Sequence, residues 1–237
     1  MVSWNNKNDF NTPQDSSGMT SGIGNNLSNK LKRGYKHGSL TEGLIAYYPM
    51  EKGQGQVLHD AALDNIGQIK PGSSGGNATV SDMWTTGKAG THALDFDGSD
   101  DYVDTNIASL TAPLTVSMWV NLDDTSSKQF YFGNFNGTNG DLYFLWDSSN
   151  SNWKVDDDYA TNLSGGSAST GSWYLLSYII DPSSRRLYVN DSVVDSSSSG
   201  HTSTFDSGLN FRIGDIGSGD YADAQVDDLR VYNRVLS

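Results

Sequence analysis

The chain has 237 residues, no cysteine and a formal net charge of −13 at pH 7. Its length suits one large all-β domain or one domain with a tail, and the lack of cysteine excludes a disulfide framework and thiolate metal or redox chemistry. No run of about 18 apolar residues occurs, so we expect no membrane-spanning helix.

The charge is unevenly distributed along the chain. Residues 1–40 hold five basic and two acidic residues, a net charge of +3, which leaves −16 for the remainder. So acidic a remainder argues against nucleic-acid binding. The acidic residues are nearly all aspartate, with Glu42 and Glu51 the only glutamates. This composition is typical of a salt-adapted, halophilic protein, and equally of a loop-rich β protein that places aspartate in its turns.

Residues 1–40 are rich in asparagine, serine and glycine and lack apolar periodicity, which predicts a flexible or extended N-terminal arm. The stretch Leu27–Tyr35 suits a turn of helix or a segment that docks on a partner, and the alternative is a solvated linker. No signal peptide is visible at the N-terminus. The basic residues expected to contact a protein partner are Lys30, Lys32, Arg33 and Lys36.

From Thr41 the pattern changes to short β runs separated by clusters of glycine, serine, aspartate and asparagine. No stretch has a sustained helical period. Many strands with glycine-rich turns predict an all-β, two-sheet antiparallel β-sandwich over residues 41–237. The predicted strands are Leu44–Tyr48, Ala93–Phe96, Tyr102–Asp104, Leu114–Asn121, Gln129–Gly133, Asp141–Trp146, Trp173–Ile180, Arg186–Asn190, Asn210–Ile213 and Gln225–Tyr232.

The order of these runs resembles the laminin-G-like jelly rolls of the concanavalin A-like lectin/glucanase superfamily. The pieces that carry the resemblance are GLIAYYPMEKGQG, ALDFDGSDDYVD, LTVSMWVN, GSWYLLSYIID, RLYVND, LNFRIGD and VDDLRVYNRVLS. They extend from about residue 42 to the end of the chain. The resemblance implies the fold but leaves the function open, because this fold occurs in lectins, adhesion modules, pentraxins and glycosidases.

The resemblance also implies one structural calcium ion. In such domains a glycine carbonyl in the turn between two strands, an early residue and an aspartate of the last strand bind the ion; here these are Gly98, Glu51 and Asp227. Strict alternation places Asp227 on the core side with Leu229 and Val231, where a buried carboxylate needs a partner. The alternative is that Asp97–Asp101 simply caps a turn and that Asp227 accepts hydrogen bonds.

Catalysis is disfavoured by the residues available. The glycosidases of this superfamily are similar to one another in carrying two glutamates on one strand, whereas Glu42 and Glu51 lie nine residues apart. The four histidines form no metalloprotease or triad signature. The cluster Asp156–Asp158 lacks the spacing of an EF-hand and is typical of a solvated loop. We therefore expect no enzyme.

Ligand binding is suggested by an aromatic-rich stretch between Phe130 and Trp153, because tyrosine and tryptophan rings stack on glycans and keep a polar group. The alternative is that most of these rings fill the core. The candidate ligand-binding residues are Tyr131, Tyr143, Trp153 and Asp157.

These observations favour a structural or binding protein exposed on a particle or cell surface. The first hypothesis is a virion component of a capsid or tail, with an adhesion or host-attachment role. Residues 1–40 anchor it to protein partners, and we expect a homo-oligomer. The alternative is a secreted or cell-surface carbohydrate-binding module that binds glycans. A glycoside hydrolase is the third hypothesis, which the two glutamates disfavour.

Overall fold

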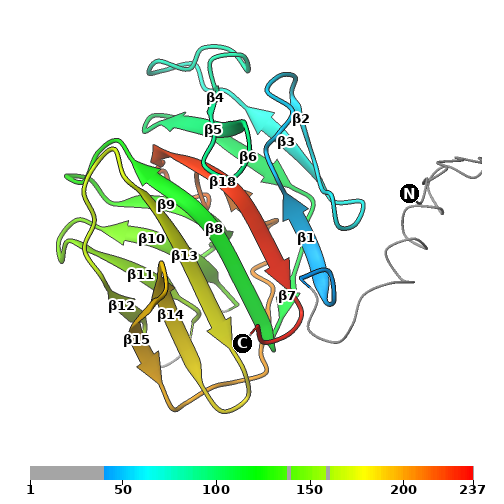
Figure 1. The fold of residues 1–237 in the computed structure, drawn as a ribbon, viewed down its shortest axis with the longest axis vertical. Helices are drawn as coiled ribbons and strands as arrows, with labels where there is room; N and C mark the ends of the chain where they lie inside the picture. The colour runs from blue at the N-terminus through cyan, green and yellow to red at the C-terminus, as the bar shows by residue number, and fades with distance from the viewer. Residues whose placement is uncertain (1–39, 138–139, 159–160, 237) are drawn as a thin grey trace, which may run out of the picture. The chain divides into compact units, whose positions relative to one another are not determined.

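The computed structural model describes residues 40–137, 140–158 and 161–236, which form a two-layer β-sandwich (Figure 1). Every strand pairing is antiparallel, as predicted for the all-β, jelly-roll fold class. No helix of the described residues is long and apolar enough to cross a membrane. The four basic residues predicted to contact a partner lie outside the described residues, as does the rest of the predicted arm up to residue 39.

The first sheet has eight strands in the order β15-β14-β13-β8-β18-β5-β4, and β1 pairs with the last residues of β18. Its strands are β1 (Leu44–Tyr48), β4 (Trp84–Thr86), β5 (His92–Asp97), β8 (Leu114–Leu122), β13 (Trp173–Ile180), β14 (Arg185–Val189), β15 (Ser192–Ser197) and β18 (Asp223–Tyr232).

The second sheet also has eight strands, in the order β12-β11-β10-β9-β17-β6-β3-β2. They are β2 (Val57–His59), β3 (Ile66–Lys70), β6 (Tyr102–Thr105), β9 (Gln129–Asn134), β10 (Leu142–Asp147), β11 (Asn152–Asp156), β12 (Leu163–Gly165) and β17 (Arg212–Ile213). A separate two-stranded sheet is formed by β7 (Leu110–Thr111) and β16 (Thr204–Phe205).

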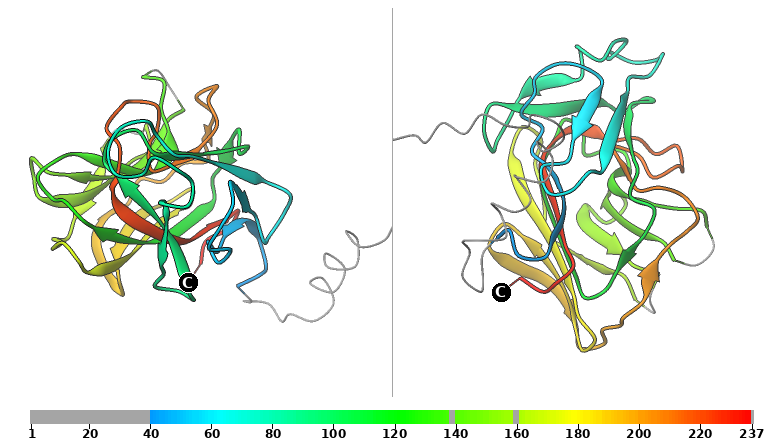
Figure 2. Two further views of the ribbon diagram at one scale, coloured as in Figure 1. Left: turned by 90° about the horizontal axis from the view of Figure 1, so that it is seen from above. Right: turned by 90° about the vertical axis from the view of Figure 1, so that its right-hand side faces the viewer.

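The core lies between the two sheets, which Figure 2 shows as separate layers in its right-hand view. Strand β8 illustrates why: Leu114, Val116, Met118, Val120 and Leu122 alternate along it and all are 0% exposed. A strand with this period of two places every second side chain on one face, so the residues between them point to the outer face of the first sheet. That outer face carries the candidate site.

All ten predicted strands are present, with ends displaced by at most two residues. Eight further strands were not predicted. Some of these are only two or three residues long, and others, such as the polar β15 and the glycine-containing β3, have no clear apolar alternation. Their backbone pairing is supplied by neighbouring strands rather than by a hydrophobic pattern of their own.

Two β-bulges change which face the following residues occupy. In β18 the register shifts between Asp227 and Arg230, and Asp228 has a φ of 52°. Asp227 therefore pairs with Trp119 on the outer face of the sheet, and its predicted position on the core side beside Leu229 is wrong, although its side chain is fully buried as predicted. In β9 a similar shift leaves Tyr131 without a paired residue in β10.

Candidate functional site: a groove on the outer face of the first sheet

A groove of about 500 Å³ lies on the outer face of the first sheet, over strands β14, β13, β8 and β18. This volume is within the usual range of small-molecule binding clefts. Its lining combines serine and threonine hydroxyls, two tyrosines, two arginines and a few aliphatic side chains. Leu40, Val235 and Leu236 complete its rim.

Two small residues at the centre of the sheet create the hollow. One row across four strands consists, in order, of Tyr188, Ser177, Ser117 and Arg230. Directly paired residues point to the same face of a sheet. The two serines are the smallest members of this row, and the long side chains of Tyr188 and Arg230 stand on either side of them. The row therefore forms a floor with two walls.

The next row along the strands closes one end of the groove. It consists of Arg186, Ile179, Thr115 and Tyr232. The Thr115 hydroxyl donates to the backbone carbonyl of Arg234 at 2.7 Å and accepts the N–H of Leu236 at 3.1 Å. These two bonds fix the C-terminal segment at the rim of the groove.

Arg230 is held in place by its neighbours. Its guanidinium lies 4.6 Å from the centre of the Tyr47 ring, and it contacts the Asp228 carboxylate at 3.0 Å. Burial opposes its charge, but Asp228 and the Tyr47 hydroxyl together outweigh this effect and raise the pKa of Arg230. The Nε atom is buried and has no hydrogen-bond partner within the described part of the chain. Arg230 is thus a rigid, charge-balanced side of the groove.

Arg186 is the less constrained of the two arginines. Its Nη2 donates to the Ser184 hydroxyl at 2.9 Å, and it contacts no carboxylate among the residues that the structure describes. The hydroxyls of Ser117 and Ser177 likewise make no hydrogen bond to a described residue. The groove therefore presents guanidinium donors and hydroxyls that the fold itself does not use, next to the Tyr188 ring. Such a set suits a polar, hydroxyl-bearing ligand.

The structure corrects two of the predicted ligand-binding residues. Tyr131 and Trp153 are both 0% exposed, so no ligand can reach their rings. The bulge in β9 turns Tyr131 into the core, where its ring centre lies 5.8 Å from that of Trp153. Trp153 in turn packs edge-on against Trp146. These rings serve the core, as the alternative interpretation of the aromatic stretch held.

Tyr143 lies on the outer face of the second sheet, away from the groove. Its ring packs edge-on against Phe130 and Phe135, and its hydroxyl donates to the Asp156 carboxylate at 2.9 Å. Burial, with a smaller effect of Asp156, raises the pKa of its hydroxyl. Tyr143 is partly exposed, but it is not brought together with the other predicted ligand-binding residues.

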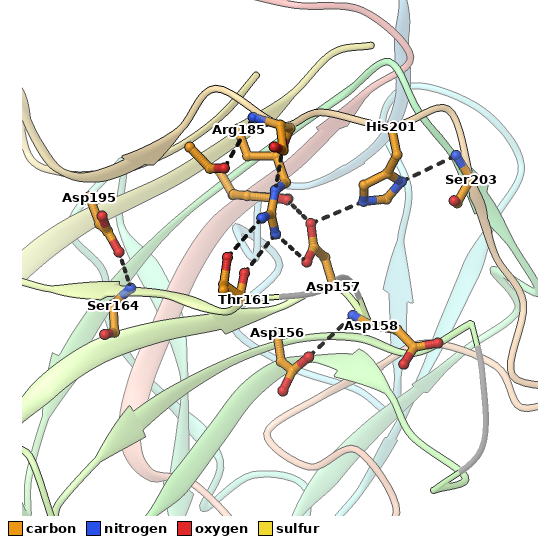
Figure 3. Close-up of polar contacts among 12 residues, drawn as sticks. Asp156, Asp157, Asp158, Thr161, Ser164, Arg185, Asp195, His201 and Ser203 are labelled. Carbon is orange, nitrogen blue, oxygen red and sulfur yellow. Dashed lines mark hydrogen bonds and ion pairs between the residues drawn. The ribbon is translucent and has the colours of Figure 1, made fainter. Parts of the chain in front are cut away.

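Asp157 is a buried structural residue, which corrects its predicted ligand role (Figure 3). Its carboxylate forms an ion pair with Arg185 at 2.7 Å, and both side chains are 1% exposed. The Tyr178 hydroxyl donates to the same carboxylate, and His201 Nε2 lies 3.1 Å from it. Asp157 is thus committed to the interior. The cluster Asp156–Asp158 is only in part the solvated loop that the sequence suggests.

The predicted calcium ligands are not brought to one point. The Gly98 N–H donates to the carbonyl of Ala222, directly before β18. Asp227 is five residues beyond Ala222, which corresponds to roughly 16 Å along a strand. Calcium binds its ligands at about 2.3–2.6 Å, so Gly98 and Asp227 do not fit a single ion. This part of the predicted set is therefore wrong.

Glu51 and Asp227 do meet at one feature, the turn formed by residues 87–91. Glu51 accepts the N–H of Thr91 at 2.9 Å, and Oδ2 of Asp227 accepts the N–H groups of Lys88 and Ala89 at 2.8 and 2.7 Å. The other oxygen of Asp227 is buried without a hydrogen-bond partner in the described residues. Burial raises the pKa of Asp227 to about 6. An oxygen in this state fits a cation.

The turn Asp97–Asp101 anchors a neighbouring loop. Asp97, Asp100 and Asp101 present oxygens that all lie within 4.8 Å of one another. They accept the N–H groups of Asn77, Ser73 and Gly72 respectively at 2.7, 2.8 and 2.8 Å. Each of the three carboxylates is thus satisfied by hydrogen bonds and does not require a metal ion.

Asp95, in β5, lies at an acidic end of the outer face of the first sheet. We expect it to make the stability of the fold depend on pH. Burial, followed by repulsion from Asp123 and Asp223, raises the pKa of Asp95 to about 6, above its ordinary value of 3.8. The folded chain therefore holds this proton more tightly than the unfolded chain does. The contribution of Asp95 to stability is then greatest below about pH 4 and is lost as the pH rises through about 6.

We expect Asp95→Asn to flatten this dependence. Urea unfolding at several pH values between 4 and 7 should show the variant gaining stability relative to the parent chain as the pH rises, with no gain at pH 4. Asp64→Asn, at an exposed loop position, serves as the control and should parallel the parent. A parallel profile for Asp95→Asn as well would contradict the assignment.

Comparisons with known proteins place this fold. A family model described as the concanavalin A-like lectin/glucanases superfamily matches residues 97–237. A search of curated proteins gives no match. Among solved structures, domain 4 of AbnA, a GH43 extracellular arabinanase from Geobacillus stearothermophilus, in complex with arabinotriose, is similar with a TM-score of 0.62 and 17% identity. The match covers 82% of this chain and 94% of that domain.

Two further solved structures have the same fold. Trypanosoma rangeli sialidase matches with a TM-score of 0.57 and 16% identity over 82% of this chain, which spans only 31% of the sialidase. The receptor binding domain of botulinum neurotoxin D matches with a TM-score of 0.59 and 13% identity, over 84% of this chain and 51% of that one. At these identities the likeness concerns the fold alone.

Proposed function

We propose that this chain, which belongs to the concanavalin A-like lectin/glucanases superfamily, is a non-enzymatic module that binds glycans in the groove over Ser117 and Ser177. The observation that carries the proposal is the set of polar groups that the fold leaves unused there, beside the Tyr188 ring. Glycans offer hydroxyls to such groups and flat ring faces to tyrosine. The similar arabinanase domain, which is described in complex with arabinotriose, lends support by analogy.

The absence of an enzymatic role is part of the proposal. Glycoside hydrolysis generally uses two carboxylates about 5–10 Å apart on either side of the scissile bond. Among the residues that line the groove only Asp191 carries a carboxylate. Glu51 instead binds the turn at residues 87–91, and Glu42 uses its backbone carbonyl to accept a bond from Arg234. This inventory supports binding without turnover.

A glycan array probed with the full chain tests the proposal. We expect saturable binding to a subset of glycans, competed by the same glycan in solution, with no release of reducing ends on long incubation. An array without hits in the presence and absence of calcium would contradict glycan binding. Hydrolysis of a bound glycan would contradict the non-enzymatic role.

We also propose one structural cation, calcium, at the free oxygen of Asp227. The turn at residues 87–91, which Glu51 and Asp227 both bind, would then be fixed against the sheet by the ion as well as by hydrogen bonds. Adding calcium should raise the melting temperature of the chain, and a chelator should lower it. Asp227→Asn should abolish the response, whereas Asp64→Asn should keep it. A melting temperature indifferent to calcium and chelator would contradict the proposal.

Exposure on a particle or cell surface, with residues 1–40 binding protein partners, stays a prediction. Size-exclusion chromatography with light scattering on the full chain and on residues 41–237 tests it. Assembly that requires residues 1–40 would support an anchoring segment and a homo-oligomer. Monomers in both cases would contradict the assembly role and leave a free-standing glycan-binding module.

A further inference from the structure

The arginines of the first sheet differ in whether their charge is already neutralised. Arg185 pairs with Asp157, and Arg230 pairs with Asp228. Arg186 has no carboxylate partner in the described residues, although the chain as a whole carries a net charge of −13. A guanidinium without a carboxylate partner in the groove attracts an anion locally.

Resting on the proposed function, we propose that the groove selects an acidic glycan, with a carboxylate of the ligand bound by the guanidinium of Arg186. A guanidinium has five N–H donors in a planar fork that matches a carboxylate in two-point contact. Among the residues that the structure describes, only one donor, on Nη2, is used, for the Ser184 hydroxyl at 2.9 Å. The remaining donors have no partner in the described part of the chain and can bind the ligand.

The rest of the groove favours a ligand whose other groups are neutral. From Arg186 the groove runs past the hydroxyls of Ser177 and Ser117 to Arg230. The charge of Arg230 is already balanced by Asp228 at 3.0 Å, so it suits a hydroxyl or carbonyl oxygen better than a second carboxylate.

Asp191 adds a further restriction. It lies at the turn after β14 and lines the same groove as Arg186, with no ion-pair partner among the described residues. A ligand with a carboxylate on every unit would meet this negative charge, whereas one with an isolated carboxylate would avoid it. A uniformly acidic peptide is therefore disfavoured, and a glycan in which acidic and neutral sugars occur together fits best.

The test compares acidic glycans with their own methyl esters. The full chain is applied to uronic-acid-containing and sialylated oligosaccharides, each spotted beside its neutral ester, and hits are titrated in solution at low and high salt. We expect each acidic glycan that binds to do so about tenfold to a hundredfold more tightly than its ester, with the difference shrinking at high salt.

Variants then assign the preference to a residue. Arg186→Gln should remove the preference for the acid while leaving binding of the neutral ester, and Lys154→Gln, the same charge change on the second sheet, should keep it. Asp191→Asn should strengthen binding of acidic glycans. Equal affinity for acids and esters, or an Arg186→Gln variant that keeps the preference, would overturn the inference while the proposed function stands.

Two other outcomes separate the remaining possibilities. Failure of every glycan to bind would overturn the proposed function and the inference together. An oligoglutamate peptide is also tested as a competitor. If it competes as effectively as the acidic glycan does, the assignment of a glycan ligand is overturned. Circular dichroism and melting curves of each variant establish that it is folded before its affinity is compared.

Discussion

Replacing Arg185 by alanine is expected to lower the free energy of unfolding by about 3–5 kcal/mol, because it leaves the buried Asp157 carboxylate without its cation. Arg185 also donates to the backbone carbonyls of Thr161 and Ser199 at 2.9 Å. The substitution therefore leaves two acceptors and one charge without these bonds inside the protein. Such a loss is a large fraction of the stability of a typical domain.

The neighbouring Arg186 supplies a matched control. It is partly exposed and contacts no buried carboxylate, so Arg186→Ala should change stability by less than about 0.5 kcal/mol. Urea unfolding followed by tryptophan fluorescence compares the two variants. Equal stabilities of Arg185→Ala and Arg186→Ala would contradict a structural role for the buried ion pair.

A double variant separates the charge from the packing. When Asp157→Leu is combined with Arg185→Met, no buried charge is left unpaired, and apolar replacement of a buried ion pair is often neutral. We expect the double variant to be more stable than Arg185→Ala alone. If it is less stable, the contacts that Asp157 keeps with Tyr178 and His201 in Arg185→Ala contribute more than its unpaired charge costs.

Replacing Trp153 by alanine is expected to cost about 3–5 kcal/mol, the usual loss when a large buried aromatic is truncated. The Trp153 ring is 0% exposed, and its centre lies 5.8, 5.2 and 5.6 Å from those of Tyr131, Trp146 and Tyr174. Its removal would leave a cavity at the centre of this aromatic cluster.

Trp153→Phe provides the comparison. The indole N–H of Trp153 has no hydrogen-bond partner in the described residues, so phenylalanine removes an unsatisfied donor while keeping most of the ring. We expect it to cost less than about 1.5 kcal/mol. A cost for Trp153→Phe as large as that for Trp153→Ala would show that the N–H has a partner after all. The measurement is again equilibrium urea unfolding.

The fold was largely predictable because long central strands carry their own hydrophobic pattern. Leu114–Leu122 has an apolar residue at every second position, and Trp173–Ile180 ends in three buried residues, so each is visible in sequence as a strand. The short strands β7 and β16 are two residues each and exist only through pairing with each other. No window of the sequence is long enough to reveal them.

The site was less predictable because it depends on register and bulges. Tyr131 faces the core because of an extra residue in β9, and Asp227 faces outward because Asp228 adopts a positive φ. Neither bulge has a clear signature in the sequence. The groove itself arises from the pairing of Ser117 with Ser177, two small residues 60 positions apart in the chain, which only the register of β8 and β13 reveals.

The central claim, that the groove over Ser117 and Ser177 binds the glycan, is tested most directly by filling it. A glycan identified on the array is titrated by isothermal calorimetry into the full chain and into two variants. Ser177→Trp fills the floor of the groove, and Ser149→Trp adds the same side chain at an exposed turn that does not line the groove. We predict that Ser177→Trp lowers the affinity at least about tenfold and that Ser149→Trp leaves it unchanged. Unaltered binding by a folded Ser177→Trp variant would contradict the assignment of the site.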